Sequence, residues 1–433
     1  MINNENSSNK VLTAFVFCFY LFALGSFGIR ARWVFIFMLF LTSFLALLYT
    51  KTGTITINNY KKKLYIVYFV IALFIFFPNA RRHSDIYNFL MYITIIVYVG
   101  TIIRTDSKEI SDIKKIMIYM GLFFAFYISF FRFFPGLYRV TIYKFLASSV
   151  KDTYNLNSGF GYGFPIGNSY TFADSAILLG MVSLISTDLV EEEKDIRYKL
   201  YLMIMFAGMV LEGRKSELLA AFLTVVYLYS FELKGNKRIL RQRLKYVICI
   251  ILFTIIALKV FENNDLLHRF NVLIDRLKQN HSGNKVDYTS GRFALWGNAI
   301  KLFMKYPIIG AGWGRFANYT KGYYQEVETS IHDTHNVFLQ LLCEIGIIGT
   351  LFIVSPILVI LHRVWKKARY FKKGLYKNNC AGNSYFCLGI LLYSILLSFM
   401  DPNFYSPFFW SMFIICIVIQ DHEERDGWGI NLK

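Results

Sequence analysis

The sequence predicts an all-α, polytopic integral membrane protein of about twelve transmembrane helices. Hydrophobic residues make up 55% of the 433-residue chain and aromatic residues 18%, whereas soluble domains keep an apolar share of about 45–50%. The mean hydropathy is +0.42. Several apolar runs reach the roughly 18–20 residues that cross a bilayer. We therefore expect one membrane domain over residues 1–433.

Apolar runs bounded by charged or turn-forming segments define the expected spans. From the N-terminus they are residues 11–29, 33–50, 64–78, 86–103, 116–134, 170–190, 196–213, 215–233, 246–261, 335–361, 382–400 and 407–421. Only Lys10 closely precedes the first run, which is long and has no convincing cleavage site, so we interpret it as an uncleaved span. Charged residues interrupt the run 196–233 near Glu212 and Arg214. Two spans are therefore expected there, with Arg214 at their external mouth.

The charge distribution sets the expected orientation. The formal net charge is +19, but Lys and Arg lie mostly in short loops, which indicates topology rather than nucleic-acid binding. The inner segments hold about three times as many Lys and Arg residues as the short outer loops, which places both termini in the cytoplasm. The basic runs 232–245 and 362–377 then face anionic lipid headgroups. The cysteines fall in spans or a basic loop, so neither a disulfide framework nor a zinc site is expected.

Two outer loops are long. Residues 135–169 contain SGFGYGFPIGNS, which is either a solvated connector or a wall that stacks on sugar rings. Residues 262–334 form the larger, periplasmic loop and contain an amphipathic helix from Arg292 to Tyr306, after a plausible N-cap at Ser290. Its expected apolar face, directed at the membrane surface, consists of Phe293, Trp296, Ile300 and Phe303.

A glycine turn and two histidines follow this helix. Gly310, Gly312 and Gly314 come after Pro307 and predict a tight turn whose backbone can approach a ligand closely. A dinucleotide site is not expected, because that motif needs a strand before the glycines. His332 and His335 stand just before an apolar run, where a histidine can carry a proton near neutral pH. The spacing of these histidines and Asp333 is too loose to favour a metal site.

Three motifs carry a resemblance to a known family. They are Arg-x-x-x-Leu at 214–218, Gly-Arg-x-x-x-Trp with Pro-x-x-Gly-x-Gly at 291–312, and His335-Asn336 followed after nine residues by Gly346-x-x-Gly349. In this order they resemble the bacterial O-antigen ligases and the O-antigen or capsule polymerases. The resemblance extends from about residue 200 to about residue 361. The Gly346 and Gly349 pair is read most simply as permitting close helix packing.

The resemblance implies a metal-independent, inverting glycosyltransferase without a cofactor. It would work in the bacterial cytoplasmic (inner) membrane, with its active site facing the periplasm. The donor is an undecaprenyl-diphosphate-linked glycan. The acceptor is a second lipid-linked glycan for a polymerase, which the two long outer loops favour slightly, or lipid A core for a ligase. Membrane lipids are further expected partners. If the protein is a polymerase, a chain-length regulator is another candidate partner.

The implied site consists of one base and several cations. His335 is the expected catalytic base, and Arg214 and Arg292 are the catalytic cations that also bind the diphosphate. Arg315 and Asn336 are further expected substrate-binding residues. Either Asp333 or Asn336 is the expected residue that orients His335. The structural alternatives are an Arg214 paired with Glu212 or Glu217, a solvated Arg292 or Arg315, and a His335 that is only hydrogen-bonded at the interface.

A transporter or flippase is the alternative from another class, since twelve spans with both termini inside also fit that plan. Such a protein should contain two related halves and polar groups near the bilayer midplane. The sequence shows neither feature, and its charged residues gather towards one face.

Overall fold

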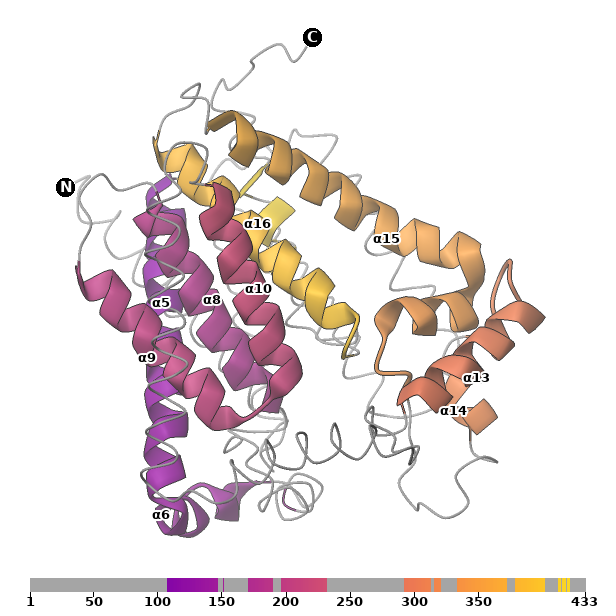
Figure 1. The fold of residues 1–433 in the computed structure, drawn as a ribbon, viewed down its shortest axis with the longest axis horizontal. Helices are drawn as coiled ribbons and strands as arrows, with labels where there is room; N and C mark the ends of the chain where they lie inside the picture. The colour runs from indigo at the N-terminus through magenta and orange to yellow at the C-terminus, as the bar shows by residue number, and fades with distance from the viewer. Residues whose placement is uncertain are drawn as a thin grey trace, which may run out of the picture.

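The structure is a computed structural model that describes part of the chain. The described residues are 107–146, 151, 170–189, 196–231, 292–312, 315–320, 333–371, 378–401, 412–413, 415–417 and 419–420. All secondary-structure elements in these ranges are helices (Figure 1), which confirms the predicted all-α class. The expected spans 11–29, 33–50, 64–78, 86–103 and 246–261 lie outside them. The count of twelve spans and the outer position of loop 262–334 therefore stay predictions.

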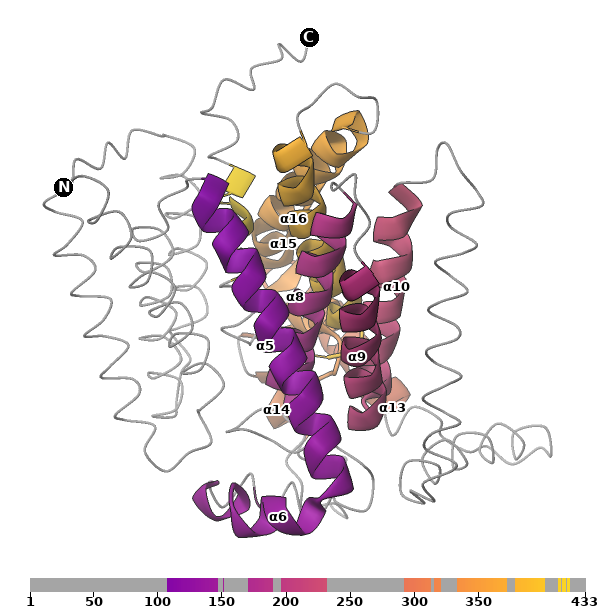
Figure 2. The ribbon, with the colours of Figure 1, turned by 90° about the vertical axis from the view of Figure 1, so that its left-hand side faces the viewer.

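The long helices follow the apolar runs. They are α5 (Ser107–Phe133), α8 (Tyr170–Asp188), α9 (Ile196–Glu212), α10 (Lys215–Phe231), α15 (Val337–Phe371) and α16 (Asn378–Ser398). Among the described residues, two helical stretches are long and apolar enough to cross a membrane, Ile110–Phe133 and Val337–Arg369. After α5 come the short α6 (Pro135–Val140) and the 3-10 helix η1 (Tyr143–Phe145), and α6 lies across the end of α5 (Figure 2).

Helices α5, α8, α9, α10 and α16 form a bundle, and α15 packs along α16 (Figure 1). Small residues let these helices approach closely. A Cβ on Gly121 of α5 would lie 3.0 Å from the Cα of Gly180 on α8, and a Cβ on Gly208 of α9 would lie 2.7 Å from Ala125 of α5. The buried side chains of all six helices form one continuous core. This core holds the ends of α8, α9, α10 and α16, where acidic and basic residues gather.

A second, smaller core joins α13 (Arg292–Lys305) and α14 (Arg315–Thr320) to the start of α15. The predicted helix is thus present, and it packs on the protein with a stripe that the sequence analysis did not name. Leu295, Ala299 and Leu302 are the residues of α13 that are buried. Phe293 and Ile300 are exposed, so their predicted contact with the membrane surface stays a prediction. Close packing against α15 selects the stripe that contains the small Ala299.

Helix α15 is broken at Gly346, where φ is 67° and ψ is −172°. The break leaves backbone groups without partners inside the helix, and the turn after α13 supplies them. The amides of Ala311 and Gly312 donate to the carbonyls of Cys343 at 2.9 Å and Glu344 at 2.8 Å. The amide of Ile347 donates to Pro307 at 2.9 Å. The glycine turn therefore binds the break in α15, and its close approach to a ligand stays a prediction.

Candidate active site

The turn 333–336 leads into α15 and carries the predicted base. Asn336 is the N-cap of α15: its Oδ1 accepts a hydrogen bond from the Leu339 amide at 3.1 Å. The Thr334 hydroxyl donates to the Asn336 carbonyl at 2.6 Å, and its oxygen accepts from the Asn336 amide at 3.1 Å. The Thr334 amide donates to Gln340 Oε1 at 2.7 Å. The turn is therefore fixed by side chains on both sides of His335.

His335 has a left-handed backbone, with a φ of 52° that is the only positive value among the described non-glycine residues. Such a conformation costs about 1–3 kcal/mol and persists where the surroundings enforce it. The His335 amide donates to Asp333 Oδ1 at 2.9 Å, and the ring Nδ1 lies 3.4 Å from the same oxygen. Asp333 therefore holds both the backbone and the ring. The imidazole is 40% exposed, which leaves it accessible to a ligand.

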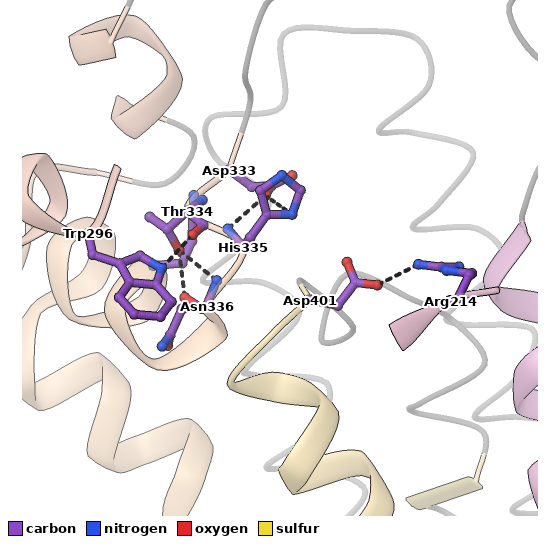
Figure 3. Close-up of polar contacts among 8 residues, drawn as sticks. Arg214, Trp296, Asp333, Thr334, His335, Asn336 and Asp401 are labelled. Atoms are coloured by element: carbon purple, nitrogen blue, oxygen red, sulfur yellow. Dashed lines mark hydrogen bonds and ion pairs between the residues drawn. The ribbon is translucent and has the colours of Figure 1, made fainter. Parts of the chain in front are cut away.

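Helix α13 is tied to this turn by its tryptophan. Trp296 Nε1 donates to the Thr334 carbonyl at 3.0 Å (Figure 3). On the inner side, Gln340 Nε2 donates to Glu344 Oε1 at 2.9 Å, and that oxygen accepts from the Phe316 amide of α14 at 3.3 Å. The small core and the turn 333–336 are therefore one hydrogen-bonded unit. Arg292, the first residue of α13, is half-buried in this unit.

Arg214 lies in the break between α9 and α10, as predicted. Gly213 has a φ of 78°, which ends α9 and starts the turn. The guanidinium forms ion pairs with Glu217, with Asp174 at 3.7 Å and with Asp401 at 3.1 Å. Burial lowers the pKa of Arg214, but these carboxylates, Glu217 foremost, raise it above its ordinary value. The pairing with Glu217, which the sequence analysis gave as the structural alternative for Arg214, is thus present, and Arg214 stays charged.

Asp401 is a site residue that the sequence analysis missed. It follows α16, and its amide donates to the Leu397 carbonyl at 2.8 Å. In the same turn, the Phe399 ring contacts Phe338 of α15 with centroids 4.7 Å apart. This contact brings the end of α16 to the start of α15, so Asp401 lies between Arg214 and His335 (Figure 3). An acidic residue directly after an apolar span was the available signal.

The charges of the predicted residues act on one another. Burial is the main cause that lowers the pKa of His335, Asp333 opposes it, and the charges of Arg292 and Arg214 lower it further. Burial likewise raises the pKa of Asp401, while Arg214 and Arg292 lower it and Asp333 raises it. Both arginines therefore lie within electrostatic reach of His335. The imidazole is neutral at pH 7 and can accept a proton.

The remaining predicted residues have different positions. Arg315, the first residue of α14, is exposed, and its side chain lies beside Gly312. The Asn336 carboxamide oxygen caps α15, so its role with substrate stays a prediction. His332 and Ser290 lie outside the described residues. Within the described ranges, His, Cys, Asp and Glu residues form no group of three that could hold a metal ion.

The described part of the chain is thus helical, with two helical stretches long and apolar enough to cross a membrane and a candidate site of one imidazole, two guanidinium groups and several carboxylates. Residues 200–354 match the family model described as O-antigen ligase. The match confirms the resemblance found from the motifs. It supports a membrane enzyme of O-antigen synthesis in the bacterial inner membrane. No curated protein matches the chain.

Proposed function

We propose that the protein is an inverting glycosyltransferase that moves a glycan from undecaprenyl diphosphate to an acceptor hydroxyl at the periplasmic face of the inner membrane. The oxygen of the hydroxyl attacks the anomeric carbon of the donor sugar. The bond from that carbon to the diphosphate oxygen breaks, and undecaprenyl diphosphate leaves with the bonding electron pair. The hydroxyl proton moves to the base. The reaction needs a neutral base and a cationic site for the diphosphate.

One observation carries this proposal: a partly exposed imidazole beside Asp333 lies across Asp401 from the guanidinium of Arg214 (Figure 3). Burial lowers the pKa of this imidazole, and the charges of Arg292 and Arg214 lower it further. Asp333 lies next to Nδ1 of His335, so Nε2 is the atom that accepts the proton from the acceptor. The interaction between Asp333 and the ring also stabilises the imidazolium that forms. Arg214 and Arg292 bind the diphosphate oxygens and stabilise the charge of the leaving group.

Two candidate functions differ in the acceptor that they use. Polymerisation, with a second lipid-linked glycan as acceptor, is favoured by the two long outer loops predicted at 135–169 and 262–334. Ligation to lipid A core is favoured by the description of the matching family. Both functions use the same donor, base and cations. We propose polymerisation first, with ligation as the second candidate.

Reconstitution with defined acceptors tests the proposal. The purified protein in liposomes receives a lipid-linked repeat unit alone, or the same unit with lipid A core. A ladder of lipid-linked products from the repeat unit alone indicates a polymerase. Product only on the core lipid indicates a ligase. Transfer in neither reaction, with both substrates intact, contradicts the proposal.

A further inference from the structure

The surroundings of Arg214 carry more negative charge than is expected at an unoccupied binding site for an anion. Glu217, Asp174 and Asp401 all pair with its guanidinium, and the charge of Glu212 also acts on it. A diphosphate would approach a cation that these carboxylates already neutralise. Since like charges repel strongly in a partly buried site, at least one carboxylate must move or be protonated before the anion binds.

The three ion-pair partners of Arg214 differ in how firmly they are held. Asp174 and Glu217 belong to α8 and α10 within the bundle, and the side chain of each is only 1% exposed. Glu217 Oε2 also accepts a hydrogen bond from the Ser216 hydroxyl at 2.9 Å. Asp401 is 19% exposed and lies in a turn after α16. Asp401 is therefore the partner that can leave Arg214 with the least disruption of packing.

Asp401 also occupies the place where a bound diphosphate is expected. It lies on the side of Arg214 that faces His335 (Figure 3). The charge of Arg292 acts on Asp401 as well as on His335. An anion that binds Arg214 on this side would overlap with the position of the Asp401 carboxylate, whose Oδ2 lies 3.1 Å from the guanidinium. The contact between Phe338 and Phe399 joins the turn that contains Asp401 to the start of α15.

We infer that Asp401 is a displaceable internal ligand of Arg214, which the diphosphate of the donor replaces. This inference rests on the proposed function. In the empty site Asp401 Oδ2 accepts the hydrogen bond from Arg214 at 3.1 Å. On binding, diphosphate oxygens take this position, and the Asp401 carboxylate turns to solvent. Asp174 and Glu217 stay on the guanidinium and keep it oriented. Because a diphosphate carries more charge than a monophosphate, it displaces Asp401 more readily.

Binding of inorganic pyrophosphate tests this inference on the purified full-length protein in detergent. Asp401→Asn should lower the Kd by about tenfold, because the competing carboxylate charge is removed. Asp401→Ser is the second variant, with the same expected direction. Asp112→Asn is the control, since it removes a partly exposed carboxylate of α5 that pairs with Lys115 and not with Arg214, and its effect on the Kd should stay under about threefold. Arg214→Gln should raise the Kd by about tenfold or more.

A double-mutant cycle separates displacement from a general effect of charge. In the Arg214→Gln protein, Asp401→Asn should change the Kd by less than about threefold, because the bond that it competes for is gone. Equal tightening with and without Arg214, or weaker binding by both Asp401 variants, would overturn the inference. If Arg214→Gln and Arg292→Gln both leave the Kd unchanged, the proposed diphosphate site itself is wrong, whatever the Asp401 variants do.

Discussion

The indole nitrogen of Trp296 donates a hydrogen bond to the backbone carbonyl of Thr334 at 3.0 Å. This bond joins α13 to the residue directly before His335. It explains the tryptophan of the Gly-Arg-x-x-x-Trp motif, because the same helix that begins at Arg292 also fixes the turn of the proposed base.

Trp296→Phe should therefore reduce glycan transfer while the protein stays folded. The change keeps the aromatic volume but removes the donor, which costs about 1 kcal/mol of turn stability. We expect kcat to fall about tenfold, because small displacements of a catalytic group are costly. The measurement is the rate of transfer by the reconstituted protein. Met304→Ala, an exposed position on the same helix, is the control. A Trp296→Phe enzyme with wild-type kcat would contradict this role.

Gly310→Ala should destabilise the protein strongly. A Cβ at Gly310 would lie 2.3 Å from the backbone of Glu344, and its φ is 73°. Overpacking and the left-handed backbone together should cost about 2–4 kcal/mol. Thermal unfolding in detergent measures the change. Gly297→Ala is the matched control, because nothing lies within 4 Å of the added Cβ. It should stabilise α13 by up to about 1 kcal/mol. Equal melting temperatures for the two variants would disprove the close contact.

The pH dependence of transfer should follow the neutral form of His335. Activity should rise with pH through the pKa of His335, which burial lowers from its ordinary value of 6.5. The positive charge of Arg292 lowers this pKa further, so Arg292→Gln should move the acidic limb to higher pH. Asp333 raises it, so Asp333→Asn should move the limb to lower pH. A pH profile of kcat for the three proteins measures both shifts. Shifts in the same direction for both variants would exclude His335 as the titrating group.

Substitution of Asn336 separates capping from substrate binding. Asn336→Ala should lower the free energy of unfolding by about 1 kcal/mol, because the cap of α15 is lost. Asn336→Ser keeps a capping oxygen and should keep both stability and activity. Unfolding temperature and transfer rate are measured together. A Ser variant that is stable but inactive would show that the carboxamide contacts substrate.

The sequence predicted the positions of those helices that are set by apolar runs and by the charged residues that interrupt them. Charges near Arg214 interrupt an apolar run, and α9 and α10 end and begin on either side of that residue. The apolar run after His335 likewise predicted α15. The break at Gly346 was not foreseen, because its backbone partners come from the distant turn at Pro307 and Ile308. A local pattern contains no information about such a pairing.

The sequence analysis named the motif residues of the candidate site and did not name its carboxylates as part of the site. His335, Arg214 and Arg292 stand in motifs of the family, and their charges act on one another in the structure. Asp401 stands outside the matched segment 200–354, and the packing of α16 against α8 and α10 brings it to Arg214. The buried stripe of α13 was missed for a related reason, since its partner surface is formed by α14 and α15.

The most direct test of the central claim is the transfer rate of His335→Ala with a lipid-linked glycan donor in liposomes. The account predicts a loss of at least about a hundredfold in kcat, because the general base is removed. Binding of pyrophosphate should stay close to wild type, since both arginines remain. Unchanged product formation by His335→Ala would contradict the account.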